Sequence, residues 1–313
     1  MSSLRSMLFV PGDSEKKLAK AADGAADALI LDLEDAVTAE RRPLARKVVL
    51  DYLRQRPRGA VQQGVARRGA AQQTWVRINP LSELATSLAD LAAVVAGAPD
   101  GIVVPKVNSG QDIAMLDHFL SALEQREGVA AGSIHIIAVA TETAAGTLAL
   151  ASYQGCSPRL AGLTWGAEDL AAALGASSNR DETGEWEFTY RMARSLCLLA
   201  AHAAQVQAID TLTVDFRDDD RLAREVRAGR RAGFTGKIAI HPNQVDIINA
   251  GFMPDAAEIA HAQAIVDAFA ANPQAGALQI AGHMVDRPHL VQAMKVLAAG
   301  KGRATKSQDA KSR

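Results

Sequence analysis

Glu142 and Asp169 are the residues of this sequence best suited to hold a metal ion. Each follows a short apolar run, IIAVATET (136–143) or LTWGAEDL (163–170), and loops after neighbouring parallel strands would bring the two carboxylates together. Because no His or Cys lies nearby, a hard cation that keeps several waters, such as Mg²⁺, suits them. Taken singly, Glu142 could cap the next helix, and Asp169 could cap or pair within its own turn. For the pair we favour a metal site.

Arg77 stands in the otherwise apolar run WVRIN (75–79). A guanidinium buried in such a strand must be paired. It could form a structural salt bridge, or it could be a fixed cation beside the metal that binds a carboxylate or a developing oxyanion. Both can hold, because a further acid would orient the arginine. The candidate acids all lie in LILDLED (29–35): Asp32, Glu34 and Asp35.

These three acids end one strand, where like charges are costly unless cations share the site. A solvated cluster at a helix start is the simpler interpretation. We expect instead that one acid points inward, to the metal waters or Arg77, while the others cap the following helix.

Four further polar residues follow apolar runs or stand in the C-terminal region. Lys106 of IVVPK (102–106) could form a Schiff base, but a structural or electrostatic role is favoured over it. Asp215 could serve only as a helix cap. His241 could contact a ligand or be satisfied by hydrogen bonds. Asp286, which precedes Arg-Pro in HMVDRPH, is most simply a helix N-cap.

The elements that must position these residues alternate between strand-like and helix-like segments. Eight strand-like runs, most of them ending in a polar side chain, are each followed by an amphipathic stretch, which predicts an α/β fold, a (β/α)8 TIM barrel with its active site at the C-terminal strand ends. The runs are 6–13, 29–35, 75–79, 102–106, 136–143, 163–170, 212–215 and 238–244.

The expected organisation has three parts: a catalytic barrel over 1–250, a C-terminal helical extension or lid over 251–300, and a disordered tail over 301–313. The Gly-, Gln- and Arg-rich segment 57–73 breaks the rhythm, so we expect a surface loop there.

Composition excludes several classes of protein. The 313 residues carry a formal net charge of −1, which gives no reason to expect binding to nucleic acid or to a membrane surface. No apolar run approaches the length of a membrane span, and the N-terminus lacks the apolar region of a signal peptide. Cys156 and Cys197 form no metal motif and suit free thiols in a reducing compartment. We therefore expect a cytoplasmic protein.

Several motifs, in order along nearly the whole chain, resemble the citrate lyase beta-subunit-like family of the HpcH/HpaI aldolase superfamily. They are RSMLFVPG (5–12), LDLEDAV (31–37), VRIN, VPKV, ET (142–143), GAEDL (166–170), GFTGKIAIHPNQV (233–245) and GHMVDRP (282–288). The resemblance implies a (β/α)8 barrel with a C-terminal extension, and a homo-oligomer, either a trimer or a hexamer.

The resemblance also implies roles for individual residues. Glu142 and Asp169 would be Mg²⁺ ligands, with Glu142 also contacting the substrate. Arg77 would bind the substrate carbonyl or carboxylate and stabilise an enolate. Asp286 matches an acid/base that malyl-CoA lyase-like members deliver from a neighbouring subunit. The residues at coenzyme A contact positions are Phe9, Lys20, Ile240 and His241.

The sequence departs from these relatives at Ser14, where malyl-CoA lyases tend to carry an arginine for the phosphates of coenzyme A. Lys16 or Lys17 could replace it. The departure leaves open whether the acyl carrier is coenzyme A or a carrier protein.

The implied reaction is Mg²⁺-dependent cleavage or formation of a carbon–carbon bond in a 3-hydroxyacyl thioester such as malyl-, citramalyl- or citryl-CoA, with an acyl-CoA and a 2-oxo acid as products. Three alternatives stay open: thioester hydrolysis at the same site, a pyruvate-type aldolase acting on free hydroxy-oxo acids, and a non-catalytic subunit of a lyase complex.

Overall fold

The computed structural model describes residues 3–56 and 72–309. The chain divides into two compact units, Met1–Asn249 and Ala250–Arg313. Most of the surface loop expected over 57–73 lies outside the described residues, which resume at Gln72. Within the described ranges, no helix is both long enough and apolar enough to span a bilayer.

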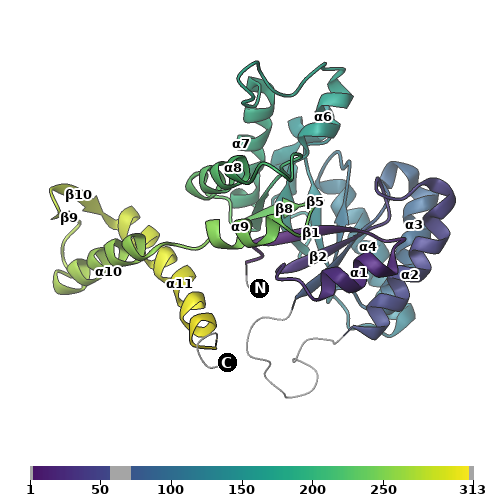
Figure 1. Cartoon of the computed structure of the whole chain (residues 1–313), viewed down its shortest axis with the longest axis horizontal. Helices are drawn as coiled ribbons and strands as arrows, with labels where there is room; N and C mark the ends of the chain where they lie inside the picture. Colours follow the sequence, from purple (N-terminus) through teal and green to yellow (C-terminus); the bar gives the residue numbers. More distant parts are fainter. Residues whose placement is uncertain (1–2, 57–71, 310–313) are drawn as a thin grey trace. The chain divides into compact units, whose positions relative to one another are not determined.

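The first unit contains a closed parallel barrel built, among the described residues, from eight strands in chain order, which confirms the predicted (β/α)8 barrel (Figure 1). The last strand closes the barrel against the first, with Met7 beside Ile238. The strands are β1 Ser6–Pro11, β2 Ala28–Asp32, β3 Gln73–Arg77, β4 Gly101–Val104, β5 His135–Val139, β6 Leu160–Thr164, β7 Gln207–Asp210 and β8 Gly236–Ala239.

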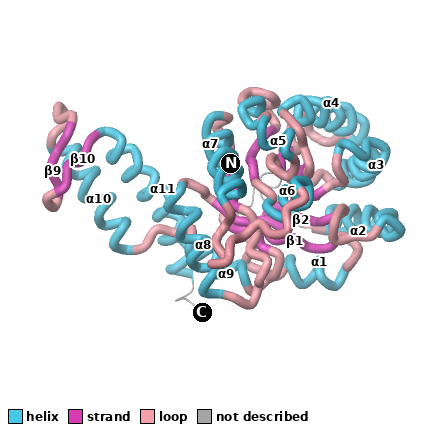
Figure 2. The backbone as a smooth tube through the Cα atoms, turned by 90° about the horizontal axis from the view of Figure 1, so that it is seen from above, coloured by secondary structure: helices cyan, strands magenta, loops and turns pink. Residues whose placement is uncertain are grey.

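The helices of this unit lie outside its strands (Figures 1 and 2). Local signals set many of their ends: Ser109 caps the start of α4 and Gly128 closes it in a left-handed conformation, while Asp218 and Gly233 do the same for α8. The helices are α1 Glu15–Ala22, α2 Arg42–Gln55, α3 Leu84–Val94, α4 Gly110–Glu127, α5 Ala144–Leu148, α6 Ala167–Leu174, α7 Phe188–Ala203, α8 Asp219–Ala232 and α9 Gln244–Gly251, with short 3-10 turns η1 Ala39–Arg41, η2 Leu81–Glu83, η3 Val95–Gly97 and η4 Leu150–Tyr153.

The seventh strand lies earlier in the chain than its sequence pattern predicted. The prediction at 212–215 is wrong, because β7 is Gln207–Asp210 and the described backbone at 212–215 is not a strand. Residues 206–214 read VQAIDTLTV, a nearly continuous strand-like run. Closure of the barrel decides which part of this run pairs as a strand, since Ile209 pairs with Thr164 on β6 and with Gly236 on β8. Short-range periodicity cannot supply that register.

Side chains from alternate strand positions fill the barrel interior. Met7, Ile30, Trp75, Val103 and Ile209 belong to one buried apolar cluster. The indole of Trp75 needs space that its neighbour on β4 provides: a Cβ built on Gly101 would lie 2.1 Å from the Trp75 ring. Glycine at 101 is therefore a packing requirement at the base of the barrel.

The second unit combines helices with a hairpin. Helix α10 (Ala256–Ala271) and helix α11 (Arg287–Asp309) share an apolar core with the antiparallel strands β9 (Ala277–Ile280) and β10 (His283–Asp286). The expected extension was helical only, so the hairpin is a correction. Its turn places Ala281 and Gly282 at positive φ, and Ala-Gly is a weaker turn signal than the usual Asn-Gly.

The end of the chain also differs from expectation. The backbone of α11 continues through Asp309, where disorder was expected from residue 301, and residues 310–313 lie outside the described part of the chain.

Replacing Gly101 with alanine should destabilise the barrel by about 1–3 kcal/mol, because the new methyl overlaps the buried indole of Trp75. Urea unfolding of the Gly101→Ala variant measures the loss. Gly276→Ala is the control, since a Cβ at residue 276 meets nothing within 4 Å. Equal stability of Gly101→Ala and the unaltered protein would contradict this account of the interior.

Candidate active site

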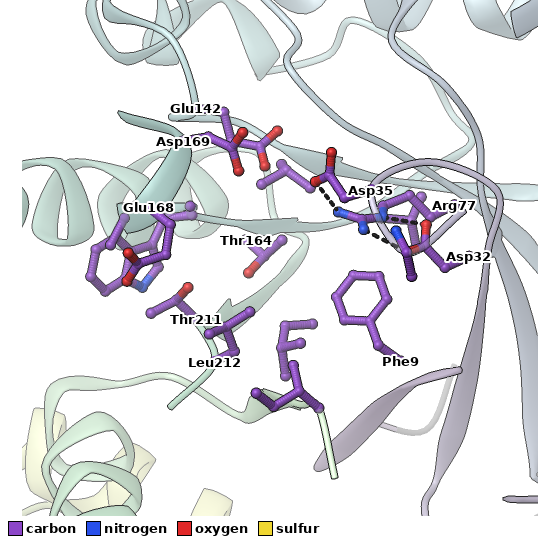
Figure 3. Close-up of a pocket in the computed structure, with 18 of the residues that line it drawn as sticks. Phe9, Asp32, Asp35, Arg77, Glu142, Thr164, Glu168, Asp169, Thr211 and Leu212 are labelled. Atoms are coloured by element: carbon purple, nitrogen blue, oxygen red, sulfur yellow. Dashed lines mark hydrogen bonds and ion pairs between the residues drawn. The ribbon is translucent and has the colours of Figure 1, made fainter. Parts of the chain in front are cut away.

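A cavity of about 410 Å³ lies at the C-terminal ends of the barrel strands. Its lining combines acids, one arginine and an apolar wall, contributed by strand ends and the segments that follow them (Figure 3). The lining residues are Phe9, Pro11, Asp32, Asp35, Ala36, Arg77, Val103, Val139, Glu142, Thr164, Trp165, Gly166, Ala167, Glu168, Asp169, Trp186, Thr211, Leu212, Ile238 and Ile240.

Arg77, the last residue of β3, is held by a two-pronged ion pair. Its Nε and one terminal nitrogen donate to the two carboxylate oxygens of Asp32, each at 2.7 Å, and the guanidinium lies 4.4 Å from the ring centroid of Phe9. The other terminal nitrogen lies 2.9 Å from Glu34 and 3.4 Å from Asp35. Burial opposes its charge, but Asp32, Glu34 and Asp35 outweigh burial and raise the pKa of Arg77. Arg77 is a fixed cation.

The three acids at the end of β2 and just after it, Asp32, Glu34 and Asp35, do not take the roles that we expected from the sequence. Asp32 accepts from the backbone nitrogens of Glu34 (3.0 Å) and Ala36 (3.1 Å) as well as from Arg77, so one residue both orders the turn and holds the arginine. Glu34 and Asp35 contact cations rather than capping the next helix, since the short turn before α2 begins after Thr38. Burial raises the pKa of Glu34 to about 7, although Arg77 pulls against it.

Lys106 serves this cluster through both its backbone and its ammonium. Its φ of 51° is left-handed, and its backbone N–H donates to Glu142 at 2.6 Å. The ammonium contacts Glu34 and lies 3.4 Å from Asp35 and 3.3 Å from Asp169. These acids outweigh burial and raise the pKa of Lys106. A Schiff base needs an unprotonated amine, so this environment supports the electrostatic role.

Glu142 and Asp169 come to the same cavity from adjacent strand ends (Figure 3). Glu142 is only 4% exposed, and the lack of a side chain at Gly166 makes room for it, because a Cβ there would lie 2.6 Å from Glu142 Cγ. Thr143, not Glu142, caps α5, whereas Asp169 lies in the first turn of α6. The capping alternative for Glu142 is therefore wrong.

The electrostatics of this pair fit a divalent cation. Burial, and then the charge of Asp169, raise the pKa of Glu142 to about 8, so the two carboxylates lack enough positive charge between them. Among the described residues, no group of three or more His, Cys, Asp or Glu residues is arranged to hold a metal. Two carboxylates with room beside them suit an ion that keeps waters or substrate oxygens as its other ligands, as Mg²⁺ does.

The cavity lining also contains residues that the sequence pattern did not single out. The indole N–H of Trp165 donates to buried Asp210 at 2.7 Å, and Trp186 meets Trp165 edge-on at 5.3 Å between ring centroids. Arg180 lies 3.4 Å from the Trp186 ring centroid. Trp165 stands beside the GAEDL motif and could have been found there, but nothing in the sequence places Trp186 in the cavity.

Of the four residues expected to contact coenzyme A, two line the cavity and two do not. Phe9 and Ile240 line the cavity, whereas His241 stacks on Phe216 at 4.7 Å between ring centroids. Lys20 is exposed on α1 and does not line the cavity. Ser14 caps α1 by accepting from Lys17 N, so the residue at this departure from the family has a structural role. Contact with coenzyme A stays a prediction for all four positions.

The remaining two acids lie outside the described cavity lining. Asp215 accepts from the backbone nitrogen of Arg217 at 3.0 Å and orders a turn, while Asp218 caps α8. Asp286 ends β10 in the second unit, where its carboxylate lies 2.5 Å from His289 Nδ1. Asp286 also accepts from His289 N at 3.5 Å, as a residue before a helix does. Its role in catalysis stays a prediction.

The fold and the cavity define a (β/α)8-barrel protein with an acid-lined site at the strand ends where such enzymes carry out their chemistry. The chain belongs to the HpcH/HpaI aldolase/citrate lyase family, whose profile matches residues 5–242. It is 33% identical to a (3S)-malyl-CoA thioesterase of Cereibacter sphaeroides over 94% of this chain and 93% of that protein. It is 32% identical to citrate lyase subunit beta of Haemophilus influenzae, with 96% and 98% covered.

Solved structures agree with this membership. Protein CitE of Mycobacterium tuberculosis, in complex with magnesium, acetoacetate and coenzyme A, matches with a TM-score of 0.76 and 30% identity over 96% of this chain and 99% of that one. The citrate lyase beta subunit of the same organism, complexed with oxaloacetate and magnesium, matches with a TM-score of 0.64 and 31% identity over 81% and 98%.

Asp210, which accepts the hydrogen bond of the Trp165 indole, should make the free energy of unfolding depend on pH. Burial alone would raise the pKa of Asp210, but Lys237, Arg194 and Trp165 together lower it. The unfolded chain then binds more protons below about pH 4, so this stabilisation is present above that pH and is lost as the pH falls. Asp210→Asn should cost about 3–5 kcal/mol at pH 7, because Arg194 loses its buried partner.

Urea unfolding of the Asp210→Asn variant and the unaltered protein between pH 3 and pH 7 measures both effects. The difference between the two proteins should shrink toward the acid end. A difference that stays constant with pH would rule out an ionised Asp210 as its source.

Proposed function

We propose that this protein is an Mg²⁺-dependent carbon–carbon lyase that cleaves or forms a 3-hydroxyacyl thioester, with an acyl thioester and a 2-oxo acid as the other side of the reaction. The observation that carries the proposal is the convergence of Glu142, Asp169 and Arg77 on one cavity at the strand ends. The magnesium, acetoacetate and coenzyme A bound by CitE of Mycobacterium tuberculosis support the same ligand chemistry here.

Glu142 and Asp169 are the proposed Mg²⁺ ligands, with Glu142 also next to the substrate. When bound, the ion would polarise the oxygens of the 2-oxo acid half and lower the pKa of the hydroxyl. The backbone N–H of Lys106 fixes one oxygen of Glu142, and Gly166 keeps the neighbouring space clear. The lysine ammonium lies beside Glu34 and Asp169 and offsets part of the negative charge around the pair.

Arg77 is the proposed stabiliser of negative charge on the thioester enolate. Bond cleavage places that charge on a carbonyl oxygen, and a preoriented cation in a water-poor cavity stabilises it without reorganising. Asp32 holds the guanidinium at two points and Phe9 lies against it, so Arg77 is preoriented. Asp32, Glu34 and Asp35 thus support Arg77 rather than react themselves.

Two further proposals concern the proton and the assembly. Removal of the hydroxyl proton requires a base, and Asp286 is proposed for it, delivered by a neighbouring subunit of a trimer or hexamer, with residues 251–300 acting as a lid. Phe9, Lys20, Ile240 and His241 are the proposed coenzyme A contacts. Phe9 and Ile240 already line the cavity, which supports that half of the assignment.

Thioester hydrolysis at the same site is the second candidate. It is favoured by the likeness to the (3S)-malyl-CoA thioesterase of Cereibacter sphaeroides. Both reactions would use the same metal ligands and arginine, but only carbon–carbon cleavage releases a 2-oxo acid. Product analysis with malyl-, citramalyl- and citryl-CoA in the presence of Mg²⁺ separates the two: glyoxylate, pyruvate or oxaloacetate marks the lyase, and a free hydroxy acid marks the thioesterase.

Glu142→Gln and Asp169→Asn should each lower Mg²⁺-dependent turnover by at least about a hundredfold, because several kcal/mol of charge stabilisation are lost with the ion. The barrel should stay folded in both variants by far-UV circular dichroism. Release of 2-oxo acid from the thioester panel is the measurement.

Asp215→Asn is the matched control: it removes an acid that orders a nearby turn outside the cavity lining, and it should retain turnover. Metal-dependent activity that survives in both Glu142→Gln and Asp169→Asn would rule out these residues as the metal ligands.

A further inference from the structure

The indole of Trp186 lines the cavity although the residue stands in a loop. Trp186 lies between α6 and α7, and its side chain is partly exposed. Its ring meets the ring of Trp165, a second lining residue, edge-on at 5.3 Å between centroids. The two residues form an aromatic surface, which we call the tryptophan wall. Because Trp186 lines the cavity and keeps part of its surface open, a molecule in the cavity can contact it.

Contacts within the loop and with α8 hold Trp186 in place. The guanidinium of Arg180 lies 3.4 Å from the centroid of the Trp186 ring, and the backbones of these two residues form an antiparallel bridge. Arg180 donates to the carbonyl oxygen of Gly184 at 2.9 Å and pairs with Glu225 of α8 at 3.1 Å. Arg221 of α8 donates to the same carbonyl oxygen at 3.0 Å. The ring is therefore preoriented before any ligand binds.

The tryptophan wall lies nearer to the proposed metal site than to the proposed coenzyme A contacts. Trp165 stands four residues before Asp169, in the segment that follows β6. Figure 3 shows Glu168 of this segment and Thr211 at one end of the cavity and Phe9 at the other. The 2-oxo acid half of the substrate, rather than its thioester half, therefore lies beside the wall.

We propose that Trp186 is a specificity-determining residue: its indole packs against the carbon substituent of the 2-oxo acid half and limits the size of that substituent. The inference rests on the proposed function to the extent that the metal site holds this half. A fixed ring accepts a small apolar group such as the methyl of pyruvate. Each further methylene must displace the ring or shift the 2-oxo acid from the ion, so longer 2-oxo acids are disfavoured.

A series of 2-oxo acids with growing side chains tests the wall. Titration calorimetry with Mg²⁺ compares pyruvate, 2-oxobutyrate and 2-oxovalerate. In the unaltered protein, affinity should fall by about tenfold or more from pyruvate to 2-oxovalerate, because the ring blocks the longer chain. Trp186→Ala should abolish or reverse this order and should weaken pyruvate binding by about threefold, because the methyl loses an apolar contact. Trp186→Phe should give an intermediate ratio.

Two further variants separate the indole from its loop. Phe188→Ala is the matched control, because it removes a nearby aromatic ring that is 68% exposed and is not among the lining residues. It should keep the order of the unaltered protein. Arg180→Lys retains the charge but loses the planar stacking on Trp186, so it should shift the ratio in the direction of Trp186→Ala by a smaller amount. Urea unfolding verifies that each variant is folded.

The proposal is overturned if Trp186→Ala keeps the size order of the unaltered protein, or if Phe188→Ala changes it as much, since the loop and not the indole would then be responsible. It is also overturned if the unaltered protein binds none of the three acids, or binds 2-oxovalerate as tightly as pyruvate. A protein whose size order depends on Trp186 but that releases no 2-oxo acid from any thioester would keep this inference and refute the lyase.

Discussion

The guanidinium of Arg77 and the carboxylate of Asp32 lie together at the ends of β3 and β2, and neither could be buried there alone. Their register as neighbours makes the two-pronged contact possible, and Asp32 uses the same oxygens to order the turn that carries Glu34. The pairing of β2 with β3 therefore fixes the position of the guanidinium. Glu34 and Asp35 contact this guanidinium, and Phe9 packs against it. The geometry of the cavity follows from the barrel itself.

Much of the fold could be predicted because the elements carry their own signals. Helices α4 and α8 each have a capping side chain at the start and a glycine at the end, and parallel alternation implies the barrel. The seventh strand and the hairpin were not predicted correctly, because local sequence carries little information about either. The position of β7 is set by its pairing with β6 and β8, which are distant in the sequence. The hairpin turns at Ala281 and Gly282, and Ala-Gly is a weak turn signal.

Some residues of the candidate site could likewise be predicted from the sequence, and others could not. The positions of Glu142, Asp169 and Arg77 in the cavity lining could be predicted, because a charged residue that ends or follows an apolar strand-like run is costly unless a partner or a ligand balances its charge. The position of Thr164 could not, since a threonine in a strand is ordinary until its register turns it inward and its hydroxyl is left without a partner among the described residues. Trp186 reaches the cavity from a polar segment beyond α6, so only the tertiary structure reveals it.

Lys106 shows how the protein balances charge before any ligand arrives. A glycine would adopt its left-handed backbone more easily, but it would bring no ammonium to Glu34 and Asp169. Lys106 and Arg77 therefore offset part of the negative charge of the acid cluster with residues of the chain itself. The charge that they leave is felt at Glu142, where burial and Asp169 raise the pKa of the carboxyl.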